Sequence, residues 1–343
     1  METETVGSEA RQPVMADVAK LAGVSHQTVS RVLNDAPHVR PDTRERVLAA
    51  IRELDYRPNS AARALVTRRS QTLGVVSFES TLYGPASMLD GIERAARNAG
   101  YFVSVASLRG LDSRSLQEAV DRLRDQGVEG VVVIAPQTSA VSAVGKVSSS
   151  VPLVAVGSGT RASIPMVSVD NRSGAEAATR HLLDLGHRTV HHLAGPPGWL
   201  ESQDRREGWQ RTLRAAHAWV QPVEIGDWTA RSGYEAGQRI ARLPDVTAVF
   251  CANDHMALGL LRALHEAGRS VPGDISVVGF DDIPEAAYFI PPLTTVRQDF
   301  GELGRRALEL LVAELGGSAS PVTQVQIAPE LVLRRSAAPA RRG

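Results

Sequence analysis

The chain has 343 residues, so at roughly 100–200 residues per domain it predicts two or three domains. Hydrophobic residues make up 43% and charged residues 22%, which excludes a disordered composition and allows a packed core. Basic and acidic residues number 38 each, but residues 10–70 hold eleven arginines or lysines against six acids. This asymmetry is typical of a nucleic-acid-binding unit fused to a neutral one.

The cysteine count and the absence of long apolar runs argue against disulfides, cysteine-bound zinc, secretion and membrane insertion. The single cysteine, Cys251, excludes an intramolecular disulfide and a cysteine-based zinc site. Residues 1–12 are polar and lack the apolar stretch of a secretory signal. No apolar run approaches the ~20 residues that span a bilayer. We therefore expect a cytoplasmic protein with no metal, no cofactor and no membrane contact.

Residues 13–58 carry helical periodicity in three short pieces, after a flexible tail over residues 1–12. The expected helices cover Met15–Ala22, Ser25–Asn34 and Pro41 to about Leu54. Gly23 lies in the turn between the first two helices. This layout is that of a helix-turn-helix, whose second helix enters the major groove of DNA.

The second of these helices carries side chains that can read DNA. His26, Gln27 and Arg31 share one face, and they are residue types that hydrogen-bond base edges. Three hydroxyl residues can donate to phosphates: Ser25, Thr28 and Ser30. The alternative is an ordinary solvated polar face, but the glycine turn and the local positive charge favour DNA binding.

From residue 72 onward, short β-rich runs alternate with amphipathic helical runs. The expected strands are 73–78, 101–106, 130–135, 153–156, 189–193, 248–251 and 276–280. This alternation predicts doubly wound parallel sheets, and the length of the segment indicates two such lobes. Ligands in these folds bind at the carboxyl ends of the strands.

Long stretches of the sequence resemble one known family. In the N-terminal part they are 17–19, 22–25, 28–34, 43–47 and 54–59, and in the rest 226–228, 252–259, 274–282 and 290–300. Together they resemble the LacI/GalR family of bacterial repressors, and the later ones resemble its lactose branch. The resemblance implies a small all-α helix-turn-helix headpiece followed by an α/β core of two doubly wound lobes, similar to periplasmic binding proteins.

The resemblance also implies the domain boundaries. They are a headpiece over 13–58, a hinge helix and linker over 59–70, a sugar-binding and dimerisation core over 71–336, and a tail over 337–343. Within the core, the N-lobe is expected at about 71–169 and 299–328, and the C-lobe at about 170–298 and 329–336.

A hinge helix over Ala61–Val66 is implied, which in this family orders only on operator DNA. Leu65 holds the place of a leucine that wedges into the minor groove, with Ala62 beside it, and apolar wedges do kink DNA. An ordinary helical linker is the alternative. The resemblance assigns three more DNA contacts: Asn34, His38 and Asn59.

The resemblance places a sugar between the two lobes. The matching positions are Phe78, Arg205, Trp228, Asn253, Asp281, Gln298 and Phe300. Amide, carboxylate and guanidinium groups can bond sugar hydroxyls, and an aromatic ring covers an apolar sugar face. Capping of a strand end is the alternative role for Asn253 or Asp281 taken singly.

The N-lobe half of this site departs from the lactose branch. Gly157 stands where that branch has an acid facing the sugar, and Phe78 replaces a small hydroxyl residue, with Glu79 and Tyr83 nearby. A galactoside is the leading effector, and a differently substituted or longer sugar stays open.

These features predict a homodimeric repressor of a carbohydrate-utilisation operon that binds a palindromic operator and is released by a small sugar effector. A corepressor role for the sugar stays open, because in purine-type members of this family the effector strengthens operator binding. The C-terminal tail lacks leucine heptads, so we expect dimers and not tetramers. Two rival classes are a sugar-transport binding protein and an enzyme. The sequence shows no signal peptide, which argues against the first, and no catalytic constellation, which argues against the second.

Three other patterns are set aside. Gly157–Ala162 matches a dinucleotide fingerprint, but Pro165 follows where a helix would have to run. The spacing of Trp199, Trp209 and Trp219 is treated as coincidence. Four histidines suggest a metal cluster, but two are adjacent in an expected strand and point to opposite faces: His181, His187, His191 and His192.

Overall fold

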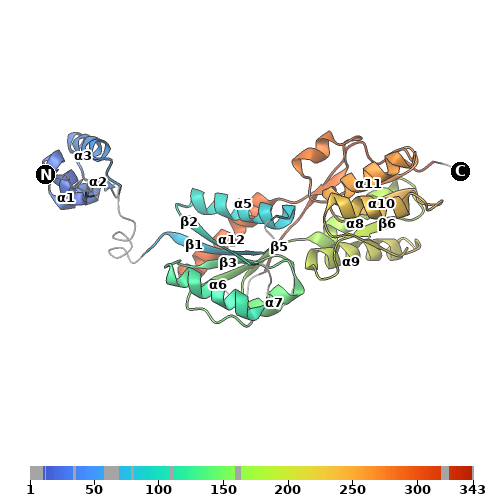
Figure 1. Cartoon of the computed structure of the whole chain (residues 1–343), viewed down its shortest axis with the longest axis horizontal. Helices are drawn as coiled ribbons and strands as arrows, with labels where there is room; N and C mark the ends of the chain where they lie inside the picture. Colours follow the sequence, from blue (N-terminus) through green and yellow to red (C-terminus); the bar gives the residue numbers. More distant parts are fainter. Residues whose placement is uncertain are drawn as a thin grey trace, which may run out of the picture. The chain divides into compact units, whose positions relative to one another are not determined.

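The protein is described by a computed structural model (Figure 1), which covers residues 11, 13–33, 36–57, 69–78, 81–108, 112–158, 164–317 and 324–341. The chain divides into two compact units, Met1–Ser70 and Gln71–Gly343. Among the residues so covered, no helix is both long and apolar enough to cross a membrane.

The first unit contains the three expected helices: α1 (Met15–Ala22), α2 (His26–Leu33) and α3 (Pro41–Glu53). Gly23 ends α1 in a left-handed conformation, with a φ of 64°. Ser25 caps α2, because its Oγ accepts the backbone N–H of Thr28 at 3.2 Å. The inward faces of the helices share one small core: Val18, Ala19, Ala22, Val29, Val32, Val47, Ala50 and Tyr56. The predicted helix-turn-helix is therefore present.

The second unit begins with an α/β lobe whose described strands are all parallel, in the order β11-β5-β4-β3-β1-β2. The strands are β1 (Thr72–Phe78), β2 (Phe102–Leu108), β3 (Val131–Ile134), β4 (Leu153–Val156), β5 (Met166–Val169) and β11 (Gln324–Ile327). The helices are α5 (Tyr83–Asn98), α6 (Ser113–Asp125), α7 (Thr138–Val144) and α12 (Phe300–Leu315). One core packs α5 and α12 on the sheet, and a second packs α6 and α7 on its other face.

The other lobe has a parallel sheet in the order β7-β6-β8-β9 and an antiparallel pair, β10 with β12. Its strands are β6 (His191–Ala194), β7 (Glu224–Ile225), β8 (Ala248–Cys251), β9 (Ser276–Val278), β10 (Thr295–Arg297) and β12 (Glu330–Val332). Its helices are α8 (Asn171–Asp184), α9 (Leu200–Ala215), α10 (Ala230–Ile240), α11 (Asp254–Glu266) and the 3₁₀ helix η1 (Pro284–Tyr288). Cys251 packs in the core beneath α11, as expected of a small hydrophobe.

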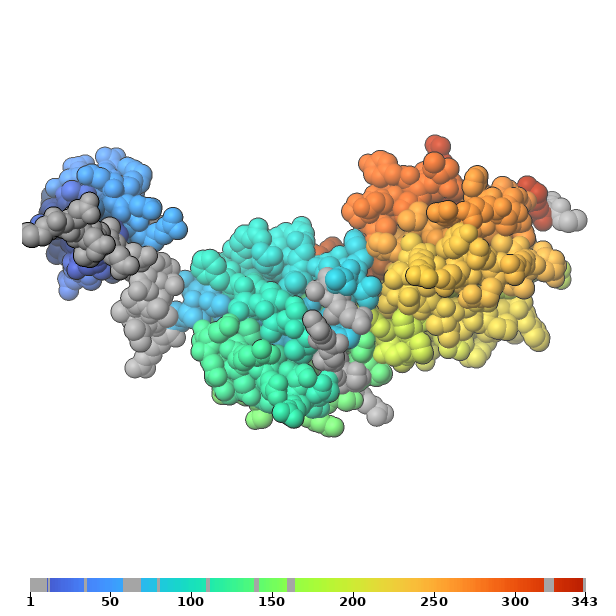
Figure 2. Space-filling model, viewed as in Figure 1, coloured from blue at the N-terminus to red at the C-terminus, as the bar shows by residue number. Residues whose placement is uncertain are grey.

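The chain passes between these two lobes after β5, after β10 and between β11 and β12. Two of these segments are bonded together, since the Asp170 N–H donates to the carbonyl of Ile327 at 2.9 Å. Figure 2 shows the lobes side by side, the first in cyan and green and the second in yellow and orange. The crossover places the N-terminus of α9 and the strand ends of the second lobe against the start of α5.

The seven expected strands are present with small shifts of their ends, for example Ser276–Val278 in place of 276–280. Five strands were not expected: β5, β7, β10, β11 and β12. Each has two to four residues. Runs this short show little of a strand period, so only the more continuously apolar ones, such as β4 and β8, were recognisable in the sequence.

Candidate ligand cavity and candidate DNA-reading helix

A cavity of about 250 Å³ lies between the lobes of the second unit. Its apolar wall includes Leu82, Tyr83, Pro85, Met88, Pro136, Trp199 and Trp228. Its polar residues are Thr81, Glu201, Arg205, Thr229, Asn253, His255, Asp281 and Gln298. An apolar cavity with a few converging polar groups is the usual form of a small-molecule site.

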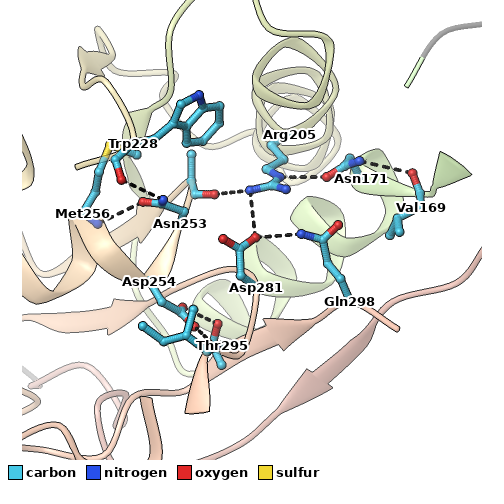
Figure 3. A network of polar contacts seen from close by, with 12 residues as sticks. Val169, Asn171, Arg205, Trp228, Asn253, Asp254, Met256, Asp281, Thr295 and Gln298 are labelled. Carbon is cyan, nitrogen blue, oxygen red and sulfur yellow. Dashed lines mark hydrogen bonds and ion pairs between the residues drawn. The ribbon is translucent and has the colours of Figure 1, made fainter. Parts of the chain in front are cut away.

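Arg205 is the centre of the polar network at this cavity (Figure 3). Its Nε donates to Asn171 Oδ1 at 2.8 Å, and its Nη1 donates to the carbonyl of Ala252. The same Nη1 lies 3.4 Å from Asp281 Oδ1. The guanidinium also stacks over the Phe280 ring, with its Cζ 3.8 Å from the ring centroid. These contacts fix the side chain in one position.

Asp281 is held from two sides. Besides Arg205, Gln298 donates from Nε2 to Asp281 Oδ1 at 2.7 Å, and Gln298 comes from the crossover between β10 and α12. Burial raises the pKa of the Asp281 carboxyl, and the Arg205 charge opposes that rise. The second carboxylate oxygen, Oδ2, keeps acceptor capacity that a ligand hydroxyl can use.

Asn253 works mainly within the protein. Its Oδ1 caps α11 by accepting the Met256 N–H at 2.9 Å, and its Nδ2 donates to the Trp228 carbonyl at 3.0 Å. This helix N-cap differs from the strand-end capping that the sequence left open for Asn253. One amide N–H stays available at the cavity wall.

Two tryptophans form the aromatic side of the cavity. Trp199 meets Trp228 edge-to-face, with ring centroids 5.7 Å apart. Trp228 has a φ of 74°, and a side chain on Gly195 would place its Cβ 2.2 Å from the Trp228 ring. Gly195 is thus required for the position of Trp228. Trp199, whose role no sequence pattern indicated, lines the cavity. Trp209 is buried in the core and Trp219 is exposed.

Two predicted ligand contacts lie elsewhere. Phe78 packs with Val76 in the core under α6, because alternate residues of β1 face opposite sides of the sheet. Phe300 stands behind the cavity wall, with its ring 6.0 Å from that of Tyr83. Neither is among the residues that line the cavity. The structure thus brings together Arg205, Trp228, Asn253, Asp281 and Gln298, but not the two phenylalanines.

The candidate DNA-reading helix presents its polar face to solvent. His26, Gln27 and Arg31 are exposed, while Val29 and Val32 of the same helix are buried. Ser25 is bonded to Thr28, with the two hydroxyl oxygens 2.9 Å apart, and Ser30 is half-buried. His38 is exposed, in the turn between α2 and α3. Four predicted contacts lie outside the described residues: Asn34, Asn59, Ala62 and Leu65.

The patterns set aside in the sequence have structural roles. Pro165 leads directly into strand β5, so residues 164–169 do not form the helix that a dinucleotide fingerprint needs. His192 is buried, and its Nδ1 lies 2.9 Å from the Phe250 carbonyl. His187 bonds the hydroxyls of Thr247 and Ser276. Over the described residues, no cluster of three or more potential ligands could hold a metal.

A helix-turn-helix with an exposed polar helix face, in one chain with a two-lobed core around an apolar cavity that holds a few polar groups, defines a ligand-responsive DNA-binding regulator. Comparison with known proteins gives the family. Residues 14–59 match "Bacterial regulatory proteins, lacI family", and residues 179–337 match "Periplasmic binding protein-like domain". The lactose operon repressor of Escherichia coli (strain K12) is 36% identical over 323 residues, 93% of this chain and 89% of that relative. The chain belongs to the lacI family.

Other relatives and solved structures agree. The transcriptional regulator CelR of Thermobifida fusca is 36% identical over 342 residues, 95% of this chain and 98% of that relative. The lac repressor dimer bound to operator and the anti-inducer ONPF has a TM-score of 0.84 at 34% identity, over 96% of this chain and 100% of that one. The CelR–cellobiose complex has a TM-score of 0.70 at 33% identity, over 94% of this chain and 99% of that one. The relatives are transcriptional regulators and not enzymes.

Proposed function

We propose that this protein is a homodimeric repressor of a carbohydrate-utilisation operon, and that a sugar bound in the cavity releases it from its operator. The observation that carries the proposal is the Arg205–Asp281–Gln298 network beside the Trp228 ring. It combines fixed hydrogen-bonding groups with an aromatic face, which together suit a ring with hydroxyls on its edge and C–H groups on its face.

The mixed polar and aromatic lining supports a sugar as the effector, and its identity is a matter for experiment. A galactoside is the first candidate, because lactose repressors are among the relatives. Cellobiose is the second, because the similar CelR structure holds it. The apolar residues Leu82, Tyr83 and Pro85 on the first-lobe side favour a ligand that carries an apolar or second-ring substituent there.

Exposed apolar groups on the second unit support a dimer. Phe102 on the edge strand β2 is 72% exposed, and Ile290 after η1 is 94% exposed. An uncovered edge strand with apolar side chains is an aggregation risk that a second copy of the chain would remove. A two-fold dimer presents two α2 helices to a palindromic operator. Because it binds DNA, the protein would be found at the nucleoid.

The test begins by selecting binding sites for the full chain from random duplex DNA. We expect a near-palindrome, and Arg31→Ala should weaken operator binding by about 1–3 kcal/mol while changing random-DNA binding little. The exposed Arg52 of α3 provides the control variant, Arg52→Ala. Lactose, methyl β-D-galactoside and cellobiose are then titrated into the operator complex. Direct repeats, or a complex that no sugar releases, would refute the proposal.

A further inference from the structure

Glu201 stands out among the residues that line the cavity. It lies in the first turn of α9, one helical turn before Arg205, so both side chains face the same side. The residue is 6% exposed, and neither carboxylate oxygen has a hydrogen-bond partner among the described residues. Trp228 Nε1, an N–H donor at the same wall, is likewise unpaired there.

A buried carboxyl group without a partner is costly, and such groups are rare in folded proteins. The one cation on the same helix face, Arg205, is already bonded to Asn171, Ala252 and Asp281. The location in the first turn of α9 offsets only part of the cost. Burial raises the pKa of Glu201 to about 7, because it destabilises the ionised carboxylate.

The surroundings of Glu201 show where its carboxyl reaches. Burial raises the pKa of Glu201, and its own backbone N–H, the Arg205 charge and the backbone N–H of Ser158 oppose that rise, although no hydrogen bond of ordinary geometry forms. Ser158 follows Gly157 at the end of β4, in the opposite lobe. Gly157 has a φ of 143°, and a Cβ there would lie 2.5 Å from the Ala135 carbonyl oxygen. That strand end therefore carries no side chain, and the carboxyl arrives from α9 instead.

We propose that Glu201 is the specificity-determining residue of this cavity, whose carboxyl accepts hydrogen bonds from two neighbouring hydroxyls of a neutral sugar held against Trp199 and Trp228. The inference rests on the proposed sugar site. The proposed contact explains why a carboxyl group that lowers the stability of the ligand-free protein is present, because the ligand supplies its missing hydrogen-bond partners. It also gives the ligand a polar anchor beside the crossover, separate from the Arg205–Asp281 pair.

The test compares Glu201→Leu and Glu201→Gln with the wild-type chain in the absence of DNA. Calorimetric titration of lactose, methyl β-D-galactoside and cellobiose gives the Kd, and thermal unfolding gives the Tm of the empty protein. We expect both variants to bind the best sugar at least tenfold more weakly. Glu201→Leu should raise the Tm by a few degrees, because it removes an unpaired polar group. Glu207→Gln changes an exposed acid on the same helix that pairs with Arg172 outside the cavity, so it should leave the Kd unchanged.

The outcomes separate the alternatives. A packing role for Glu201 predicts a lower Tm for Glu201→Leu with wild-type affinity for Glu201→Gln, and that result would overturn the proposal. If Glu201→Leu fails to fold, the folded Glu201→Gln variant decides alone through its Kd. A wild-type chain that binds none of the three sugars also overturns it. Since no DNA is present, these results do not depend on whether the chain represses an operator.

Discussion

Arg205 and Asp281 form an ion pair at 3.4 Å in which the two side chains are only 5% and 6% exposed. Removing one member of a buried pair leaves the other charge without compensation, which costs far more than losing a surface pair. The pair therefore serves two purposes. It fixes the polar groups that face the cavity, and it makes the stability of the second lobe depend on both residues.

Substitutions of Asp281 should distinguish its contribution to stability from its contribution to effector binding. We expect Asp281→Ala to lower the free energy of unfolding by about 3–5 kcal/mol, because Arg205 stays buried and unpaired. Asp281→Asn keeps an acceptor for Arg205 and should cost less, yet it should still abolish the sugar response. Urea unfolding and operator anisotropy measure the two effects. A normal sugar response in Asp281→Asn would show that the effector binds elsewhere.

The Trp228 ring should matter for the effector and not for DNA. Trp228→Ala removes the aromatic face, and Gly195→Ala displaces the ring, because the added Cβ would lie 2.2 Å from it. We expect each variant to bind operator like the wild type but to need at least tenfold more sugar for release. Trp219→Ala, a change at an exposed tryptophan, is the control. Loss of operator binding by the folded Trp228→Ala protein would contradict this assignment.

Features that depend on neighbouring residues could be predicted from the sequence, and features that depend on distant segments could not. The headpiece helices were predictable, because Gly23 and the spacing of Val29 and Val32 are local signals. Arg205, Asp281 and Gln298 were found through resemblance, but they meet only because the crossover folds distant segments together. Phe78 was placed wrongly at the cavity, since its face depends on the register of β1. Glu201 and Trp199 gave no signal in the sequence, because their positions at the cavity wall depend on how distant segments pack together.

His192 should make the core sensitive to acid. It is stacked on Phe250 at 4.8 Å, and burial lowers its pKa from 6.5 to about 4. The unfolded chain therefore takes up the proton first, so this contribution to stability is complete above pH 6.5 and is lost as the pH falls through about 4. Between pH 7 and pH 5 the loss should be about 2 kcal/mol.

Urea unfolding of His192→Gln at these two pH values checks the point. We expect the difference in unfolding free energy between pH 7 and pH 5 to shrink by that amount relative to wild type. His265→Gln, at an exposed histidine of α11, should leave the difference unchanged. An equal pH dependence in wild type and His192→Gln would show that His192 does not titrate as described.

Disruption of the proposed dimer should abolish operator binding without unfolding the chain. Ile290 is 94% exposed, so Ile290→Asp costs little in the free monomer but places a charge in an apolar contact. We expect a monomer in sedimentation equilibrium and a loss of operator affinity of at least 100-fold. Trp219→Asp, at another exposed apolar residue, should stay dimeric. A monomeric Ile290→Asp with full operator affinity would rule out binding as a dimer.

The central claim is that the cavity and the operator are coupled, and reciprocity tests it most directly. If a sugar weakens operator binding, the operator must weaken sugar binding by the same factor, typically ~5–150-fold. The measurement is the Kd of the best-binding sugar for the free protein and for the saturated operator complex. We predict weaker sugar binding in the complex. Equal affinities would show that the cavity does not control DNA binding, and tighter binding in the complex would make the sugar a corepressor.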